Sequence, residues 1–282
     1  MKNTKEKRIA VISMARNDKI FIQKWINYYG SEFGFENLYL ILDGHDQNIP
    51  ENSEKINIIR VPHIELNRLN GDRNRSQIVS KIAQGLFLRY DRVLAMDIDE
   101  FLVIDPKLNI SLKNYLNGKF KASSISALGL DVGQHLKEEV PIDLNKPFLE
   151  QRSYAHVSSR YTKPIVAFKP ITWGTGYHRV KWRNFRIDLN LFLFHFGMVD
   201  YEFAIEKNND LSRLNQGWSR HMNRRQNLFH LIENTPSING DEFFARARRG
   251  QMLFRPFYAP NKPGILKGNP IVKVPKRFQK IV

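Results

Sequence analysis

The stretch from Arg92 to Phe101 constrains the fold more than any other part of the chain. It is an apolar run that ends in three carboxylates, Asp97, Asp99 and Glu100. A run of about five apolar residues bounded by charge is typical of a buried strand in an α/β sheet rather than of a helix. In such sheets ligands bind beyond the carboxyl ends of the strands, where Asp97 is expected.

The spacing of the two aspartates suggests a metal–nucleotide site. A diphosphate is repelled by bare carboxylates, but a divalent cation can be shared between carboxylate and phosphate oxygens and then neutralises charge on a departing nucleotide. The alternative is that Asp97, Asp99 and Glu100 only form an acidic turn between a strand and a loop. The segments before and after this stretch decide between a metal–nucleotide site and a simple acidic turn.

Those segments predict alternating strands and helices. Short apolar runs at 9–14, 38–42 and 56–61 indicate three further strands. Apolar residues at three- and four-residue steps predict a helix around Ile22–Tyr29 and another over 76–89. This order predicts an α/β fold, with a mixed, mostly parallel sheet flanked by helices.

Polar residues mark where these elements should begin and end. Asn17 or Asp18 can cap the first helix, and Gly30 or Gly34 can end it. Residues 70–75 are polar and contain a glycine, so they are expected to form a loop before the second helix.

Composition excludes several classes of protein. The 282 residues include no cysteine, which rules out disulfides, thiolate metal sites and a cysteine nucleophile and is compatible with a reducing cytosol. The apolar stretch at 9–14 is too short for a signal peptide, and no run reaches the roughly 18 apolar residues of a membrane span. We therefore expect a cytoplasmic protein.

Positive charge accumulates toward the C-terminus. The formal net charge is +16, and residues 220–282 hold 13 Lys or Arg against 3 Asp or Glu. Helices are expected from about Trp218 to Ile232 and from Gly240 to Met252, followed by a proline-rich, extended tail. Basic residues mixed with Phe and Trp suit an anionic membrane surface, a charged polysaccharide or nucleic acid. Alternatively they form a solvated basic surface that aids solubility, or they pack over the rest of the protein.

Three segments together resemble a known family. They are Ser13–Asp18 with Trp25 and Gly30, Leu40–Gly44, and Met96–Leu102. In order and spacing they resemble bacterial glycosyltransferases of the GT-A fold, and most closely the family 2-like group with an Asp-x-Asp-Glu-Phe signature. The resemblance is good over 9–102 and looser to about 206.

The resemblance implies a domain organisation and an activity. Residues 1–206 would form the GT-A domain, with a nucleotide-sugar half at 1–102 and an acceptor half at 103–206. Residues 207–282 would form a basic helical and extended segment. The implied reaction is metal-dependent transfer of a sugar from a nucleoside diphosphate donor to a glycan or another hydroxyl acceptor, in surface polysaccharide synthesis.

Donor-binding residues follow from the same resemblance. Arg16 and Asn17 match the start of the nucleotide pocket, although they also suit a helix cap. Asp43 matches a carboxylate that accepts a hydrogen bond from the base, or it forms a plain Asp-Gly turn. Arg73 and Arg75 are placed to meet the diphosphate, or they are a solvated charge pair.

Metal binding is implied for three residues. Asp99 is the expected ligand, Asp97 is expected at the ribose or the metal, and Glu100 is expected to support them. His195 follows the apolar run 191–194 and matches a late histidine ligand, which suits Mn²⁺ better than Mg²⁺. The alternative for His195 is a side chain that packs in the protein without binding a metal ion.

Other polar residues are candidates for the acceptor side. His178 lies in a glycine-flanked segment expected near the same edge, where it would touch donor phosphates or acceptor. An inverting transfer needs a carboxylate base, for which Asp131 is the first choice and Glu150 the second. Either is equally compatible with a surface turn, and the family's commoner base signature is not evident.

The main alternative is a metal-dependent nucleic-acid-binding protein or nuclease, with paired carboxylates on the metal and the basic tail on phosphates. The ordered family-like segments and the lack of any recognisable nucleic-acid module argue against nucleic acid as a partner. We expect instead a nucleotide-sugar donor and a glycan or lipid-linked acceptor. Peripheral attachment at the inner face of a membrane would bring the basic segment to anionic lipid.

Overall fold

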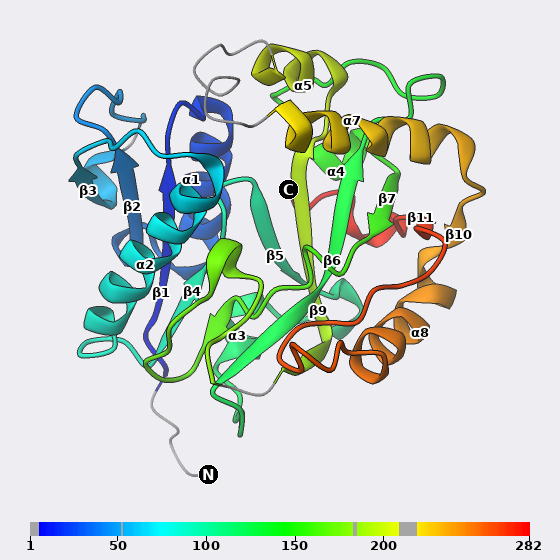
Figure 1. Cartoon of the computed structure of the whole chain (residues 1–282). Helices are drawn as coiled ribbons and strands as arrows, with labels where there is room; N and C mark the ends of the chain where they lie inside the picture. The colour runs from blue at the N-terminus through cyan, green and yellow to red at the C-terminus, as the bar shows by residue number, and fades with distance from the viewer. Residues whose placement is uncertain (1–5, 52, 183–184, 209–218) are drawn as a thin grey trace.

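The computed structural model describes residues 6–51, 53–182, 185–208 and 219–282 (Figure 1). Within these residues the strands form one 11-stranded sheet flanked by helices, which confirms the expected α/β class and mixed sheet. The strands are β1 (Ile9–Ala15), β2 (Leu38–Asp43), β3 (Asn57–Val61), β4 (Arg92–Ala95), β5 (Glu100–Ile104), β6 (Ser124–Gly133), β7 (Tyr154–Val157), β8 (Val166–Ala167), β9 (Ile187–Met198), β10 (Ile238–Asn239) and β11 (Ile271–Lys273). The α-helices are α1 (Lys19–Phe33), α2 (Arg68–Leu86), α3 (Leu112–Leu116), α4 (Phe148–Gln151), α5 (Tyr201–Asn208), α7 (Ser219–Asn234) and α8 (Gly240–Leu253), and the 3-10 turns are η1 (Phe35–Asn37), η2 (Ser53–Lys55), η3 (Pro106–Leu108), η4 (Thr175–Tyr177) and η5 (Lys276–Phe278).

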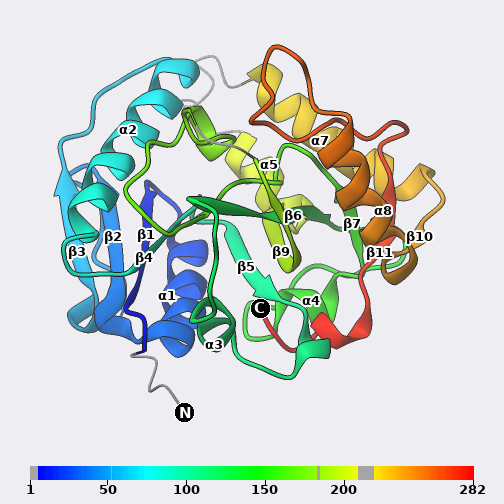
Figure 2. The same ribbon diagram turned by 90° about the horizontal axis from the view of Figure 1, so that it is seen from below.

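The N-terminal half is a parallel sheet in the order β3-β2-β1-β4, with a helix on each face. Figure 2 shows α1 and α2 on opposite sides of these strands. Ile9 and Val11 belong to the core that includes α1, whereas Ala10 and Ile12 belong to the core that includes α2. Because β1 is covered on both faces, its sequence is apolar except for Ser13 rather than alternating. All seven of its residues are buried.

Parallel pairing brings the carboxyl ends of four strands to one edge. β1 ends before Arg16, β2 ends at Asp43, β3 ends before Pro62, and β4 ends two residues before Asp97. Side chains that follow separate strands in the sequence therefore meet at this edge, as expected for a doubly wound sheet.

The second half of the sheet is held together by the long strands β6 and β9, which run parallel. β5 pairs with β9 in the antiparallel direction, so that Glu100 lies opposite His195. In the β6–β9 register Asp131 also lies opposite His195. The acidic stretch and the late histidine are thus neighbours because of strand register.

Several expected boundaries shift. Residues 70–75 are not a loop but the first turns of α2, because the Asn67 side chain caps this helix and accepts a hydrogen bond from the Asn70 amide at 3.1 Å. Asp131 lies inside β6 rather than after it. Of the two glycines expected to end the first helix, Gly34 does so, with φ of 92°.

The C-terminal segment joins the same sheet. The two expected helices are confirmed as α7 and α8, although Trp218 lies outside the described residues. Within the extended tail, β11 pairs with β7. Phe244 of α8 and Val272 and Phe278 of the tail belong to the main core. Among the described residues, no helix combines the length and apolar character needed to span a membrane.

Gly129 in β6 is required by a close backbone approach. A Cβ at this position would lie 2.2 Å from the carbonyl carbon of Tyr161 and 2.4 Å from the amide nitrogen of Thr162. We expect Gly129→Ala to lower the free energy of unfolding by about 1–3 kcal/mol, because backbone cannot move aside as a flexible side chain does. Chemical denaturation measures this loss.

The matched control is Gly85→Ala. Gly85 lies within α2, and a Cβ there meets nothing within 4 Å. This substitution should stabilise the protein by about 0.4–1 kcal/mol through the lower conformational entropy of the unfolded chain. Equal effects of the two substitutions would contradict the close approach at Gly129.

Candidate functional site

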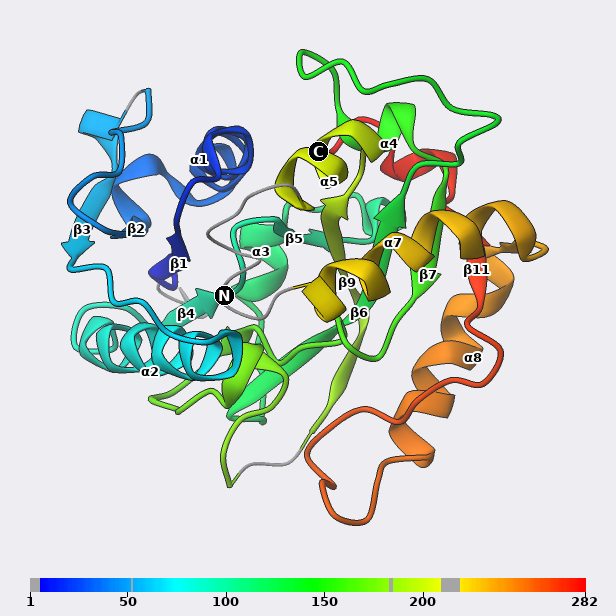
Figure 3. The same cartoon turned by 45° about the horizontal axis from the view of Figure 1, so that its top comes forward.

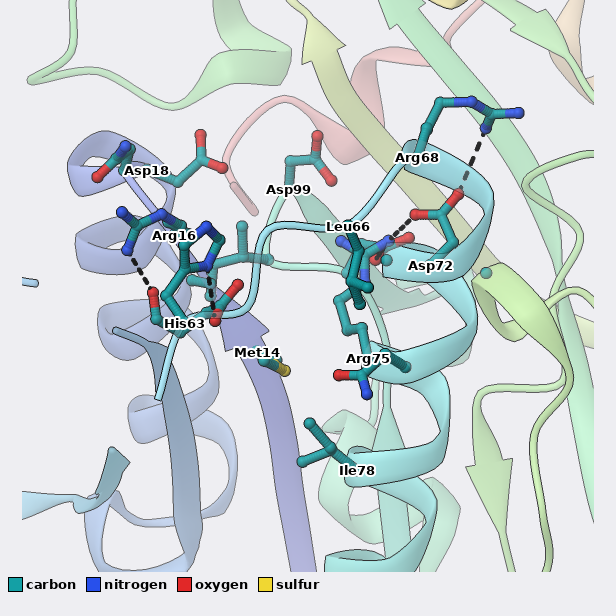
Figure 4. A pocket seen from close by; sticks show the side chains of 18 of the residues that line it. Met14, Arg16, Asp18, His63, Leu66, Arg68, Asp72, Arg75, Ile78 and Asp99 are labelled. Carbon is teal, nitrogen blue, oxygen red and sulfur yellow. Dashed lines mark hydrogen bonds and ion pairs between the residues drawn. The ribbon is translucent and has the colours of Figure 1, made fainter. Parts of the chain in front are cut away.

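A cavity of about 550 Å³ lies at the carboxyl edge of the parallel strands. Its walls come from the ends of β1 to β4, from the N-terminal half of α2 and from the segment between β7 and β9. In the view of Figure 4, Arg16, Asp18 and His63 lie on one side, Arg68, Asp72 and Arg75 on the other, and Asp99 between them. The charged and imidazole side chains of the lining are Arg16, Asp18, Asp43, His63, Glu65, Arg68, Asp72, Arg75, Asp97, Asp99, Arg160, Lys163, His178 and His195.

One wall combines the ends of β1 and β2. The Arg16 guanidinium donates to the Asp43 carbonyl at 2.6 Å and makes two 2.9 Å contacts with Asp46. The Asp43 carboxylate lies 3.1 Å from Nδ1 of His63. Asn17 lines the same wall and has φ of 54°, with its side chain hydrogen-bonded to Gln47. This wall offers planar hydrogen-bonding groups that suit a base or a ribose.

The opposite wall is the start of α2. Asp72 lies 3.3 Å from Arg68 and 3.0 Å from Arg75, so it holds both guanidinium groups along the cavity (Figure 4). Two cations beside a helix N-terminus attract an anion. Arg73, which was expected at the diphosphate, is instead exposed and does not line the cavity, because the helical turn directs it away from Asp72 and Arg75.

Lys163 is the centre of a buried charge cluster at the cavity floor. It is 2% exposed, and its Nζ lies 2.7 Å from Asp97 and 2.5 Å from Glu100. Arg75 contacts the other oxygen of Asp97 at 3.3 Å. Burial alone would raise the pKa of Asp97, but Arg75 and Lys163 lower it below its usual range. Burial raises the pKa of Glu100 to about 7, against the opposing effect of Lys163.

His195 lies between two carboxylates. Its Nδ1 donates to Asp131 at 2.6 Å, and its Nε2 lies 3.3 Å from Asp99. Tyr161 stacks on the imidazole with ring centroids 3.8 Å apart. Burial would lower the pKa of His195, but the carboxylates Asp99 and Asp131 raise it to about 9. Asp131 does not line the cavity and thus acts on His195 from behind.

The three expected metal ligands are not brought together as one set. Across the described ranges, no group of three or more His, Asp or Glu side chains is arranged to hold a metal ion. Asp99 and His195 are adjacent, whereas Asp97 is turned toward Arg75 and Lys163. Asp99 and His195 nevertheless fit a divalent cation that completes its coordination shell with phosphate oxygens and water.

The candidate bases lie outside the cavity. Asp131 is committed to His195, and Glu150 is an exposed residue of α4 that does not line the cavity. His178 does line it, and its Nδ1 donates a hydrogen bond to the Arg160 carbonyl, 2.9 Å away. Partial burial and the charge of Lys163 lower the pKa of His178 to about 3, so its imidazole is neutral at physiological pH.

Sequence reasoning missed three residues of the site: Lys163, His63 and Tyr161. Lys163 pairs with a carboxylate 66 positions away, and no local pattern around it indicates that contact. His63 could have been found, since it follows β3 immediately and so must reach the carboxyl edge of the sheet. Tyr161 is placed by the close approach of its backbone to Gly129.

No family model matches the chain, and no curated protein matches its sequence. Among solved structures, the chain is similar to a glycosyltransferase involved in the glycosylation of the major capsid of PBCV-1, at 13% identity and a TM-score of 0.26, over 48% of this chain and 56% of that one. It is also similar to a mannosyltransferase from Pyrobaculum calidifontis in complex with GDP-Man and Mn²⁺, at 10% identity and a TM-score of 0.39, over 81% and 71% of the two chains. A third is the mannosyltransferase Ktr4p from S. cerevisiae in complex with GDP, at 11% identity and a TM-score of 0.25, over 46% and 41%. The chain thus spans little more than half the length of the first of these proteins.

Proposed function

We propose that the protein is a glycosyltransferase of the GT-A type that moves a sugar from a nucleoside diphosphate donor to a hydroxyl acceptor with the help of a divalent metal ion. The observation that carries this proposal is the pairing of Asp99 with His195 in the same cavity as Arg68 and Arg75. Two potential metal ligands and two guanidinium groups face one space at the carboxyl edge of the sheet. That combination suits a metal-bound diphosphate.

The chain's own residues divide the work of donor binding. Arg16, Asp43 and His63 offer hydrogen bonds to the nucleoside part of the donor. Arg68 and Arg75 hold the diphosphate, since guanidinium groups bind phosphate in a bidentate manner. When bound, the metal ion would neutralise the charge of the departing diphosphate.

Asp131 has a different role in this proposal from the one expected of it. A carboxylate hydrogen-bonded to the far nitrogen of a metal-binding histidine fixes the orientation of the ring. The 2.6 Å contact between Asp131 and Nδ1 of His195 suits that role, and Nε2 then faces the cavity beside Asp99. Asp131 is therefore proposed as a positioning residue rather than as the base.

The finer parts of the proposal concern the acceptor. We propose a glycan or lipid-linked acceptor and a place in surface polysaccharide synthesis at the inner face of a membrane. We also propose inversion at the anomeric carbon, with a carboxylate that does line the cavity, such as Asp18 or Glu65, taking the proton of the acceptor hydroxyl. The basic C-terminal segment supports the membrane part, since clustered cations favour anionic lipid.

A thermal-shift panel of common sugar nucleotides, each with and without Mn²⁺, tests the function. We expect one donor class to raise the unfolding midpoint only when Mn²⁺ is present, because the metal ion would bridge the diphosphate and the carboxylate ligand. A ligand at 100 times its Kd stabilises the native state by about 2.7 kcal/mol, which sets the size of the shift. Glu150→Gln is the matched control, since Glu150 is exposed outside the cavity and its loss should leave this shift intact.

The nucleic-acid alternative predicts another pattern. It would give no shift with any donor, together with binding to DNA or RNA that weakens steeply with salt. That result from a folded protein would overturn the proposal.

A further inference from the structure

The chain after α8 exposes a row of large apolar side chains. Phe257 and Tyr258 are 104% and 89% exposed, and Leu253, Phe254 and Ile265 are each at least 74% exposed. We refer to residues 253–265 as the aromatic loop. It projects from the body of the molecule in Figure 3, where it is drawn in orange to red. Isolated exposed apolar residues need no explanation, but five within 13 positions of one segment form a patch that does.

Trp182 belongs to the same surface. It is 93% exposed, and its backbone adopts φ of 60°, a conformation that bulky residues rarely take. The Asn261 side chain of the aromatic loop donates a hydrogen bond to the Val180 carbonyl at 2.9 Å, which ties the loop to the segment that carries Trp182. The patch thus combines two parts of the chain that lie far apart in sequence.

The segment that carries the aromatic loop is rich in cations. Residues 243–282 contain ten Lys or Arg and no Asp or Glu. Arg246, Arg249 and Lys267 are exposed beside the aromatic loop, and Lys181 precedes Trp182. Exposed aromatic rings set among cations fit the boundary between headgroups and acyl chains of an anionic bilayer. A second copy of the same surface would carry the same positive charge and be repelled.

The surface lies close to the cavity. The positive charge of Lys262, in the aromatic loop, contributes to the lowered pKa of His178, after burial and Lys163. His178 lines the cavity. A membrane that met the aromatic loop would therefore be near the site where an acceptor must arrive.

We propose that the aromatic loop and Trp182 form a docking surface for an anionic lipid bilayer, with the exposed rings inserted at the headgroup level and the surrounding cations on lipid phosphates. Docking itself does not depend on catalysis. The consequence for the acceptor, that it is presented at the membrane surface, rests on the proposed function. Lys and Arg near the surface attract anionic lipid electrostatically, and salt screens this attraction. Insertion of the aromatic rings contributes hydrophobic binding, which salt does not screen.

Vesicle flotation tests the docking surface. The full chain is mixed with vesicles of phosphatidylcholine alone or with about 30% phosphatidylglycerol, which supplies the anionic surface. We expect binding to the anionic vesicles and at least a tenfold loss of affinity in the double variant Phe257→Ser, Tyr258→Ser. Leu88→Ser is the matched control, since Leu88 is 84% exposed elsewhere and its loss should leave binding unchanged.

Tryptophan quenching by brominated lipid gives an independent readout. Trp25 and Trp173 are buried, and Trp218 is replaced by Phe in the protein used, so Trp182 is the exposed ring that lipid bromine can reach. The quenched signal should disappear when Trp182→Phe is added. Anionic-vesicle binding without any quenching, or quenching that persists after Trp182→Phe, would place Trp182 outside the docking surface and overturn its part in the proposal.

Three results would overturn the docking surface as a whole. They are no binding to anionic vesicles at physiological salt, binding that the double variant leaves intact, and self-association in solution that the double variant abolishes. The last would identify a second copy of the chain as the occupant. Donor-induced thermal shifts measured on the same variants separate this failure from failure of the proposed function, because docking variants that still bind donor leave that function standing.

Discussion

Asp99→Asn should abolish donor binding that depends on Mn²⁺ while leaving the fold intact. Asparagine keeps the shape of the side chain but removes the charge that a hard cation prefers as a ligand. Metal coordination contributes several kcal/mol to the stabilisation of a departing diphosphate, so we expect the transfer rate and the affinity for the Mn²⁺–donor complex to fall roughly 100- to 1,000-fold. Calorimetric titration with the donor identified in the thermal-shift panel measures the affinity.

The sign of the effect should reverse without metal. In the presence of a chelator the Asp99 carboxylate repels a diphosphate, so the asparagine variant should bind the donor as well as the wild type or better. Asp143→Asn is the matched control, since Asp143 lies outside the cavity and pairs with Lys146 at 3.8 Å. If Asp99→Asn weakens binding equally with and without Mn²⁺, then Asp99 does not act through a metal ion.

Lys163→Met should cost the most stability of any single change in the site. Removal of Lys163 leaves the buried carboxylate of Glu100 without its 2.5 Å partner and leaves Asp97 with Arg75 alone. Breaking a buried pair by removing one partner costs about 3–5 kcal/mol. In a chain of this size that lowers the unfolding midpoint by roughly 6–20 °C. Thermal unfolding followed by circular dichroism measures the shift.

Lys107→Met is the matched control for this prediction. Lys107 also makes a short ion pair, 2.9 Å from Asp241, but its side chain is 60% exposed. An exposed pair contributes about 0–1 kcal/mol, so the same substitution there should change little. Adding Glu100→Gln to Lys163→Met should recover part of the lost stability, since it removes the unpaired carboxylate. No recovery would mean that packing rather than charge explains the loss.

The cost of Lys163→Met should grow with pH. The pKa of Glu100 is raised from 4.5 to about 7, so the native protein holds a proton that the unfolded chain releases, and stability falls as pH rises between these values. Without Lys163 that pKa rises further and the decline continues above neutrality. We therefore expect a larger difference from the wild type at about pH 8.5 than at about pH 6. A constant difference would contradict burial of Glu100 as an ionisable group.

The first half of the fold could be predicted from sequence with small errors. The strand at Ile9–Ala15 and the helix that carries Trp25 follow from periodicity alone. The start of α2 was placed too late because the polar residues 70–75 suggest a loop, and only the capping contact of Asn67 shows that they are helical. Intrinsic helix propensity is only weak evidence for local structure, and contacts such as this cap can override it.

The candidate site could be predicted only in part. Arg16, Asp43, Asp97 and Asp99 reach the cavity because each lies at or just beyond the end of a parallel strand. Glu150 misses it because it lies on the separate short helix α4. No pattern in the sequence around Glu150 indicates whether its side chain reaches the cavity.

The sequence by itself determined the four parallel strands of the first half, most of the two helices beside them, and that the acidic stretch ends a buried strand, because these depend on neighbours along the chain. Only the tertiary structure decided that Lys163 neutralises Asp97 and Glu100, and that His195 lies between Asp99 and Asp131. These contacts join residues more than 60 positions apart. The pairing of His195 with Asp131 depends on strand register, and a slip of one residue would turn His195 to the opposite face of the sheet.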